Sequence, residues 1–243
     1  MEFGLIGYPL THSFSKKYLT GKFRRENVNA SFENFELRSI NELPDLFNLH
    51  PGLKGLAVTS PYKRAVIPFL SGADETVQAT GSCNCIKISD KKLFGYNTDV
   101  TGFSKSIVPL LKPGIKALIL GTGGAAEAVA FSLKRLSIPF LFVSRRKSGQ
   151  ALIYPELNRD HFHSYELIIN CTPLGTFPNV KEAPPIPYDL LHPGNRLYDL
   201  VYNPAKSMFL QLGEERGAAI KNGLEMLELQ ADENLRIWMN RIN

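Results

Sequence analysis

The N-terminal part of the sequence carries polar residues that could bind a polyol and transfer a proton. Each of these residues lies next to a short apolar segment that is expected to form a strand. The residues are Ser13, Ser15, Thr59, Lys63, Asn84 and Asp99. Hydroxyl and amide groups bind the hydroxyls of a polyol, and an ammonium group binds a carboxylate or acts on a carbonyl. Taken singly, the serines also fit helix caps, Lys63 a surface charge and Asp99 an N-cap. As a set they offer hydroxyls and amides for a polyol, a cation for a carboxylate or a carbonyl, and a carboxylate beside the cation.

A glycine-rich turn in the middle of the chain indicates dinucleotide binding. The apolar segment 117–120 leads into Gly121, Gly123, Gly124 and Ala125, and a helical pattern follows to residue 136. Glycines let the backbone approach a pyrophosphate, and the helix N-terminus offers free N–H groups to the anion. The alternative is an ordinary tight strand–helix connection. About a hundred residues precede this turn, so a separate domain that holds a substrate is expected before it.

The end of the next apolar segment points to the type of dinucleotide. Residues 140–143 are followed by Ser144, Arg145 and Arg146, about 20 residues beyond the glycine turn. NAD-binding proteins usually carry an acidic residue here, which accepts from the ribose 2′-OH. Guanidinium groups suit a 2′-phosphate instead, because arginine binds phosphate in a bidentate, charge-assisted way. The segment therefore favours NADP over NAD, and the alternative is a solvated basic turn.

Alternating strand and helix patterns predict an α/β fold. We expect an N-terminal α/β substrate domain with a mostly parallel sheet, a Rossmann-type NADP-binding domain, and a cleft between them. The substrate-binding and catalytic domain is expected over 1–100 with 223–243, and the dinucleotide-binding domain over 101–222. Residues 84–89 and 92–95 predict a hairpin, whereas 147–165 shows little periodicity.

The last predicted helix, over 224–242, carries an apolar stripe and one amide beside it. The stripe comprises Leu224, Leu227, Ala231, Leu235 and Trp238. Gln230 lies off the stripe, on a side shared with Met226 and Ile237. That amide either points into a pocket or is solvated, and the sequence does not decide between the two.

Composition limits the possible classes of protein. The 243 residues include 44% hydrophobic and 21% charged residues, which is ordinary for a soluble globular protein. The net charge of +5 is modest and the basic residues are scattered along the sequence, which predicts an anionic small molecule rather than nucleic acid as partner. No apolar run is long enough for a membrane span, and no signal peptide is evident. Three cysteines without a CxxC pattern predict reduced thiols, a cytoplasmic location and no metal site.

Seven motifs in order make the sequence resemble the shikimate dehydrogenases over nearly its whole length. They span 7–15, 58–63 with Asn84, 95–99, 121–126, 170–175, 198–204, and 222–227 with Gln230. The resemblance implies reversible, NADPH-dependent reduction of 3-dehydroshikimate to shikimate, within aromatic amino acid and chorismate biosynthesis. It implies a small-molecule substrate, NADP as cofactor, and a monomer or homodimer.

The resemblance also assigns roles to individual residues. Lys63 and Asp99 would be catalytic, and the substrate would contact Ser13, Ser15, Thr59, Asn84, Tyr202 and Gln230. The cofactor would lie against Gly121, Gly123, Gly124, Ala125, Ser144, Arg145, Arg146 and Thr172. The sequence departs from the family's usual pattern at Cys85, at Glu225, at 144–146 and in a shorter 147–165 segment.

Three other functions are compatible with parts of the pattern. A quinate/shikimate dehydrogenase that uses NAD would tolerate an extra hydroxyl, but Arg145 argues against an NAD preference. A catalytically silent nucleotide-binding regulator would not need both Lys63 and Asp99. A folate-type dehydrogenase could share two α/β domains, but it would not need the Ser-x-Ser pattern.

Overall fold

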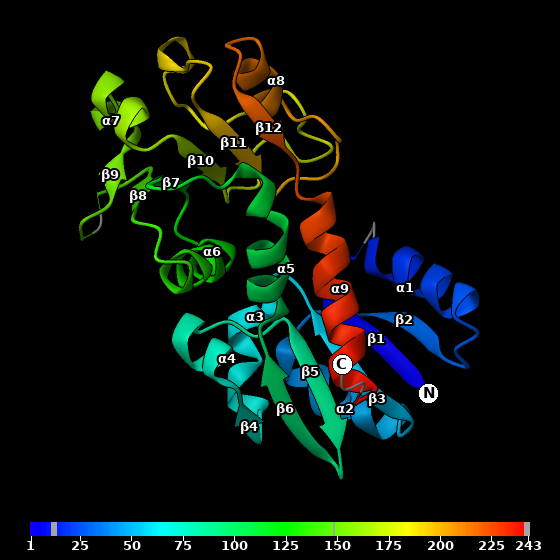
Figure 1. Cartoon of the computed structure of the whole chain (residues 1–243). Helices are drawn as coiled ribbons and strands as arrows, with labels where there is room; N and C mark the ends of the chain where they lie inside the picture. The colour runs from blue at the N-terminus through cyan, green and yellow to red at the C-terminus, as the bar shows by residue number, and fades with distance from the viewer. Residues whose placement is uncertain (11–13, 148, 241–243) are drawn as a thin grey trace. The chain divides into compact units, whose positions relative to one another are not determined.

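The chain folds into two compact units. A computed structural model describes residues 1–10, 14–147 and 149–240. The first unit comprises Met1–Thr98 with Gln230–Asn243, and the second comprises Asp99–Leu229. The sequence placed the second boundary before the last helix, at residues 222 and 223. The structure places it inside that helix, α9 (Leu224–Trp238), which is drawn in orange to red in Figure 1.

The first unit is built on a mixed six-stranded sheet with the order β2-β1-β3-β5-β6-β4. Its strands are β1 (Glu2–Gly7), β2 (Ser31–Glu36), β3 (Leu53–Val58), β4 (Gly72–Ala73), β5 (Cys85–Ser89) and β6 (Lys92–Tyr96). The pairs β1–β2, β1–β3 and β4–β6 are parallel, while β5 runs antiparallel to both β3 and β6. The predicted hairpin is therefore present. Its two-residue turn, Asp90 and Lys91, has φ of 50° and 61°, as a type I′ turn requires.

Helices connect these strands, and each helix buries part of its own surface. They are α1 (Phe14–Arg25), α2 (Leu43–Leu49), α3 (Tyr62–Ala65) and α4 (Glu75–Thr80). Proline restricts α3, because Pro61 precedes it and the 3₁₀ turn Ile67–Phe69 with Pro68 follows. Asp74 caps α4 by accepting from the backbone N–H of Val77 at 3.0 Å.

The end of α9 packs directly on the central strand of this sheet. A Cβ atom added to Gly55 in β3 would lie 2.2 Å from the Trp238 ring, so glycine is needed for this approach. The Trp238 indole stacks on Phe3 with ring centroids 5.0 Å apart, and its Nε1 donates to the Ile86 carbonyl at 2.9 Å. Leu235 and Trp238 thus belong to the core of the first unit.

The second unit is an all-parallel, six-stranded sheet with the order β12-β11-β10-β7-β8-β9. The strands are β7 (Ala117–Leu120), β8 (Phe140–Ser144), β9 (Leu152–Ile153), β10 (Leu167–Asn170), β11 (Arg196–Asp199) and β12 (Ala219–Lys221). The helices are α5 (Thr98–Ser106), α6 (Gly124–Arg135), α7 (Arg159–Ser164) and α8 (Met208–Glu214), and α9 begins in this unit. The predicted α/β class with mostly parallel sheets is confirmed.

Two expectations for local structure are corrected. The segment 147–165 is not irregular throughout, since it contains β9 and the short helix α7, which Asn158 caps by accepting from the His161 N–H at 3.2 Å. On α9, Leu224 is exposed, whereas Met226 and Gln230 are buried. Ala231, Leu235 and Trp238 of the predicted stripe are buried, so the stripe is confirmed toward the C-terminal end of the helix. Near its N-terminal end the helix is instead buried at Met226, which packs in the core of the second unit.

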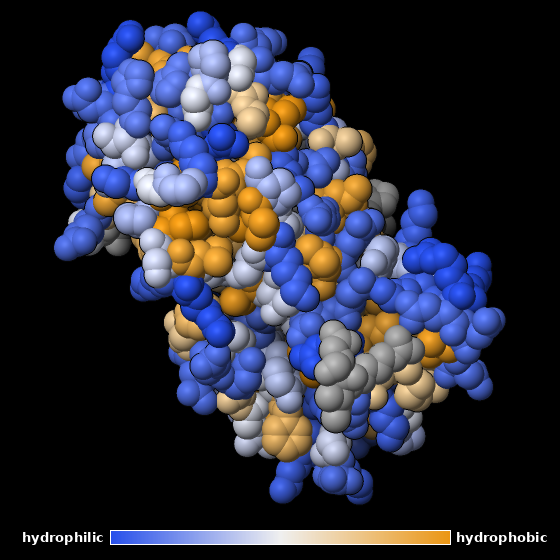
Figure 2. All heavy atoms as spheres, in the orientation of Figure 1, coloured by the Kyte–Doolittle hydropathy of each residue, from blue (hydrophilic) through white to orange (hydrophobic). Residues whose placement is uncertain are grey.

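The surface is largely hydrophilic on the face shown in Figure 2, with smaller apolar patches between the polar groups. Among the residues that the structure describes, no helix has the length and apolar character needed to cross a membrane.

Candidate active site

Several of the predicted substrate residues meet at one edge of the first sheet. The strand β3 ends just before Thr59, and the Val58 N–H donates to the Asn84 carbonyl at 2.8 Å. The Asn84 N–H in turn donates to the Tyr96 carbonyl at 3.1 Å, where β6 ends. Because β5 runs antiparallel to both neighbours, its first residue lies beside the last residues of β3 and β6. Thr59, Asn84 and Thr98 therefore come from one edge of the sheet.

Lys63 is bound to this edge through the backbone, and Asp99 is the residue that follows Thr98 at the start of the second unit. Lys63 lies in α3, half-buried, and its carbonyl accepts from the Cys83 N–H at 2.7 Å, next to Asn84. Asp99 follows Thr98 in the first turn of α5, where a negative charge is favourable at a helix N-terminus, and its side chain is buried. The backbone thus holds Lys63 beside Asn84 and Asp99 beside Thr98.

A chain of buried polar side chains links this edge to α9. The Asn84 Oδ1 atom accepts from the Thr98 N–H at 2.7 Å, and the Thr98 hydroxyl lies 2.6 Å from Asn234 Oδ1. The Asn234 amide group donates to Gln230 Oε1 at 3.3 Å. None of these four residues is more than 7% exposed. The chain fixes the orientation of the Gln230 amide, because Gln230 Oε1 must face Asn234.

The second unit gathers its candidate residues at the carboxyl edge of the parallel sheet. Gly121 follows β7 with φ of 105°, a conformation that favours glycine. A Cβ atom at Gly121 would lie 3.2 Å from Thr172 Cγ2, so the glycine also permits close approach of the loop after β10. Gly123 caps α6, a helix of 12 residues, and a Cβ there would meet no atom within 4 Å. The turn leaves space for an anionic group at the helix N-terminus.

A cleft of about 320 Å³ opens above this turn, within the second unit. It lies outside the carboxyl ends of β7, β8 and β10, where chain order reverses and doubly wound sheets bind ligands. Its lining residues are Gly121, Thr122, Gly123, Ser144, Arg145, Tyr154, Cys171, Thr172, Pro173, Leu174 and Pro185. A wider apolar hollow of about 560 Å³ shares Arg145, Tyr154 and Pro185 with it.

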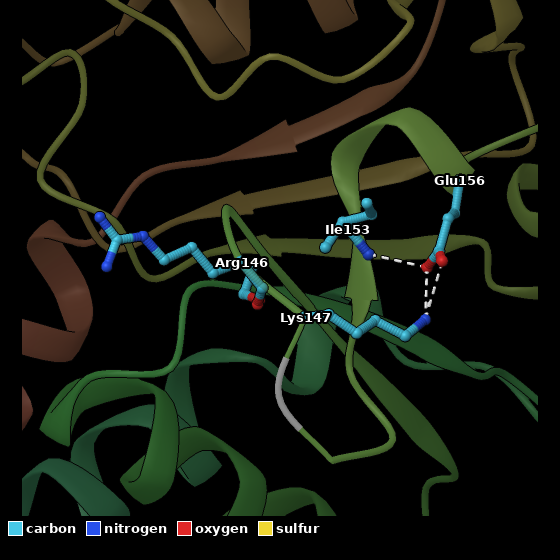
Figure 3. A network of polar contacts seen from close by, with 5 residues as sticks. Arg146, Lys147, Ile153 and Glu156 are labelled. Carbon is cyan, nitrogen blue, oxygen red and sulfur yellow. Dashed lines mark hydrogen bonds and ion pairs between the residues drawn. The ribbon is translucent and has the colours of Figure 1, made fainter.

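The basic segment after β8 is held by local hydrogen bonds, and Figure 3 shows those that reach Glu156. The Ser144 hydroxyl donates to the Arg146 carbonyl. Lys147 Nζ lies 2.8 Å from both carboxylate oxygens of Glu156, which also accepts from the Ile153 N–H at 2.9 Å. The hydrogen bond from Lys147 lowers the pKa of Glu156. The side chain of Arg146 extends away from the ion pair between Lys147 and Glu156 (Figure 3).

Arg145 is the exposed cation that lines the cleft. It lies near Tyr154. Burial raises the pKa of Tyr154 to about 12, while the positive charge of Arg145 lowers this pKa. Arg146 and Lys147 are exposed and are not among the lining residues. An anion in the cleft would therefore meet Arg145 first.

Comparison with known proteins identifies the family. Residues 5–86 match the model of the shikimate dehydrogenase substrate binding domain. The shikimate dehydrogenase (NADP(+)) of Syntrophomonas wolfei is 35% identical over 98% of this chain and 89% of its own length. The chain belongs to the shikimate dehydrogenase family.

Solved structures agree with this membership of the shikimate dehydrogenase family. The shikimate 5-dehydrogenase of Thermus thermophilus, in complex with NADP(H) and shikimate, has a TM-score of 0.88 at 25% identity, covering 100% of this chain and 94% of its own. The 5-ketofructose reductase of a Gluconobacter species has a TM-score of 0.85 at 26% identity, covering 99% of this chain and 93% of its own. The family resemblance predicted from the seven motifs is confirmed.

The remaining residues expected from the shikimate dehydrogenase pattern are distributed as follows. Ser13 lies outside the described residues, and Ser15 is half-buried on α1. Tyr202 is half-buried in the second unit, and burial raises its pKa. Gln230 is buried, so the choice that the sequence left open is decided against a solvated amide.

Several residues around these sites were not assigned a role from the sequence. Thr98 and Asn234 complete the polar chain to Gln230, and Asn170 and Asp199 support Thr172. The signal for Asn234 was its spacing of four from Gln230 on one helix face. Within the described ranges, no cluster of three or more histidine, cysteine or acidic residues is arranged to hold a metal ion.

Proposed function

We propose that this protein catalyses the reversible, NADPH-dependent reduction of 3-dehydroshikimate to shikimate. The observation that carries the proposal is that Thr59, Asn84 and Thr98 come from one sheet edge of the first unit, where the Lys63 carbonyl bonds to Cys83 and a buried polar chain leads to Gln230. Oxidoreductase activity with NADP is also the activity named for the curated family members.

The first unit would hold the substrate. In this unit Ser13, Ser15, Thr59, Asn84 and Gln230 would supply hydroxyl and amide groups for its ring hydroxyls and carboxylate. The family pattern also implies a contact from the phenol of Tyr202, which belongs to the second unit. Asn84 Oδ1 already accepts from the Thr98 N–H, so the Asn84 NH₂ group is directed by this bond. The polar chain orients these amides before the substrate binds, which reduces the entropy lost on binding.

The second unit would hold NADP. The residues fit this group, because Gly121 and Gly123 leave backbone space above the N-terminus of α6 and Arg145 lines the cleft. Gly124, Ala125 and Thr172 lie around the same turn. Arg145 would bind the 2′-phosphate, with Arg146 as a second cation and Ser144 bracing the segment through its bond to the Arg146 carbonyl.

Chemistry would rest on Lys63 and Asp99. The bound cofactor supplies a hydride to the carbonyl carbon of the substrate. Lys63 donates a proton to the carbonyl oxygen as negative charge develops there, and Asp99 orients the ammonium group. In the oxidative direction the same Lys63 accepts the proton. No step in this scheme uses a metal ion.

Absorbance of the reduced nicotinamide at saturating substrate tests the activity. Shikimate and quinate are each assayed with NADP⁺ and with NAD⁺. Reduction of NADP⁺ with shikimate, faster than the other three combinations, is expected. Absence of turnover with all four would contradict the proposal and favour a silent nucleotide-binding regulator, whereas equal rates with quinate and NAD⁺ would favour the quinate/shikimate alternative.

A second candidate substrate class follows from one comparison. A 5-ketofructose reductase shares this fold at 26% identity, so 5-ketofructose is a second candidate substrate. Adding 5-ketofructose with NADPH to the assay separates the two classes. We further propose that the protein acts in the cytoplasm as a monomer or homodimer, and sedimentation of the purified protein tests the oligomeric state.

A further inference from the structure

Four polar side chains form a hydrogen-bonded series beneath the cleft of the second unit. The Ser207 hydroxyl donates to Asp199 Oδ2, and the Asn170 amide donates to Asp199 Oδ1 at 2.9 Å. Asn170 Oδ1 then accepts from the Thr172 hydroxyl at 2.6 Å and from the Thr172 N–H at 2.9 Å. Ser207, Asp199 and Asn170 are completely buried. Only Thr172, at the end of the series, lines the cleft.

Sheet register brings Asn170 and Asp199 together. They are paired as the last residues of the parallel strands β10 and β11. Asp199 also accepts from the Val201 N–H at 2.9 Å, so its carboxylate has three donors. Burial raises the pKa of Asp199 to about 6, against the effect of these hydrogen bonds. Three donors partly offset the unfavourable burial of the charge.

The carboxylate determines which way the Asn170 amide points. An ionised carboxylate only accepts hydrogen bonds, so the NH₂ group of Asn170 must face Asp199. The carbonyl oxygen of the same amide must then face Thr172, where it receives two hydrogen bonds. Rotating the amide by half a turn would place an NH₂ group against two donors. Asp199 therefore selects the Asn170 orientation that Thr172 needs.

Thr172 is committed to the loop rather than to a ligand. Its hydroxyl hydrogen goes to Asn170, and its oxygen accepts from the Leu174 N–H at 3.4 Å. Its methyl group is the atom that a Cβ at Gly121 would approach to 3.2 Å. The hydroxyl thus fixes the loop 171–174, which forms one wall of the cleft facing the glycine turn.

We propose that Asp199 is a positioning residue for the dinucleotide cofactor, acting through Asn170 on Thr172 and the loop 171–174. Asp199 itself is fully buried and does not line the cleft. The inference rests on the proposed function, because it assigns the cleft to NADP.

Calorimetric titration of NADP⁺ into the protein tests this role, with Asp199→Ala compared with Asp199→Asn. Alanine removes the acceptor that fixes Asn170, so binding of NADP⁺ should weaken about tenfold, a change of about 1.4 kcal/mol. Asparagine keeps an acceptor toward Asn170 and Val201, and its NH₂ group faces the Ser207 oxygen. This variant should therefore bind NADP⁺ within about threefold of the wild type. Titration with shikimate should give the same affinity for all three proteins.

Asn195→Ala is the matched control, since Asn195 is also fully buried in the second unit and its side chain makes two hydrogen bonds, with Phe162 and His192. It should lower the denaturation midpoint without weakening NADP⁺ binding. If Asp199→Ala does not fold, Asn170→Ala replaces it and should show the same tenfold loss.

The possible outcomes separate this inference from the proposed function. Wild-type protein that does not bind NADP⁺ contradicts the proposed function. Wild-type binding with equal affinity in Asp199→Ala, or an equal loss in Asn195→Ala, overturns the positioning role and leaves the proposed function intact.

Discussion

The hydroxyl of Thr98 lies 2.6 Å from Asn234 Oδ1, which joins the residue before Asp99 to a helix 136 positions further along the chain. Thr98 has one hydroxyl hydrogen and two acceptors in reach, since Asn84 Oδ1 is 3.1 Å away. The shorter distance assigns that hydrogen to Asn234. Asn84 Oδ1 then accepts a hydrogen bond from the Thr98 N–H, and the Asn234 amide donates one to Gln230 Oε1.

Gln230→Ala should weaken shikimate binding about tenfold and leave NADP⁺ binding nearly unchanged. The variant removes one amide from the proposed substrate site, a loss of about 1–1.5 kcal/mol. Calorimetric titration with each ligand measures both affinities. Glu228→Ala, a change two residues away on the same helix, is the control. Unchanged shikimate affinity in Gln230→Ala would mean that this amide does not contact the substrate and only bonds to Asn234.

Lys63→Ala should mainly lower kcat, with a smaller change in substrate affinity. Loss of a general acid typically lowers the rate about a hundredfold to ten-thousandfold. Steady-state kinetics with shikimate and NADP⁺ measure the change, and circular dichroism confirms folding. Arg64→Ala removes the exposed cation next along α3 and should keep the wild-type rate. A folded Lys63→Ala protein with normal kcat would exclude Lys63 as the proton donor.

Arg145→Ala should reduce the preference for NADP⁺ over NAD⁺ by about one to two powers of ten. A charge-assisted bond to the 2′-phosphate contributes roughly 1.5–3 kcal/mol. The ratio of kcat/KM for the two cofactors measures the preference, with exposed Arg159 replaced by alanine as a charge-matched control. Arg146→Ala alone should have a smaller effect, because Arg146 does not line the cleft. If Arg145→Ala with Arg146→Ala keeps the full preference, the phosphate binds elsewhere.

Asp199 should make stability depend on pH between about 4 and 6. Its folded-state pKa is about 6, above the value of about 3.9 expected when the chain is unfolded. Between these values the folded protein binds more protons than the unfolded chain. The contribution of Asp199 is therefore fully present below about pH 4, decreases as pH rises through about 6, and is then constant.

Urea unfolding of the wild type and Asp199→Asn across about pH 4 to 7.5 measures this contribution. The asparagine does not titrate, so the stability of the variant relative to the wild type should rise with pH by roughly 2–3 kcal/mol. Other groups titrate equally in both proteins and cancel in the difference. A difference that stays constant over this range would contradict the raised pKa.

The sequence predicted the framework of both sheets because apolar runs and turn residues are local signals. The runs 117–120 and 140–143 became β7 and β8, and the glycine turn follows β7 as expected. Candidate residues at strand ends were found for the same reason, since strand ends meet at one edge of a sheet. The two-residue strands β4 and β9 were missed, because so short a segment has no apolar pattern.

The parts of the site that the sequence did not predict depend on pairs of residues that are distant in sequence. Nothing near Thr98 indicates that its partner is Asn234, and nothing in the arginine pair shows that only Arg145 lines the cleft. Only the N-terminal end of the predicted stripe on α9 was wrong, because the two ends of the helix pack in different cores and no single stripe describes the whole helix. Such features are fixed by tertiary packing rather than by local preference.

Helix α9 has a consequence for how the protein can be divided. Met226 belongs to the core of the second unit, whereas Leu235 and Trp238 belong to that of the first. A gene fragment that ends at residue 229 would cut the helix between these residues and remove the Trp238 ring from Gly55. The first unit is therefore incomplete without the C-terminal end of α9, and exchange of one unit between relatives must include a compatible α9.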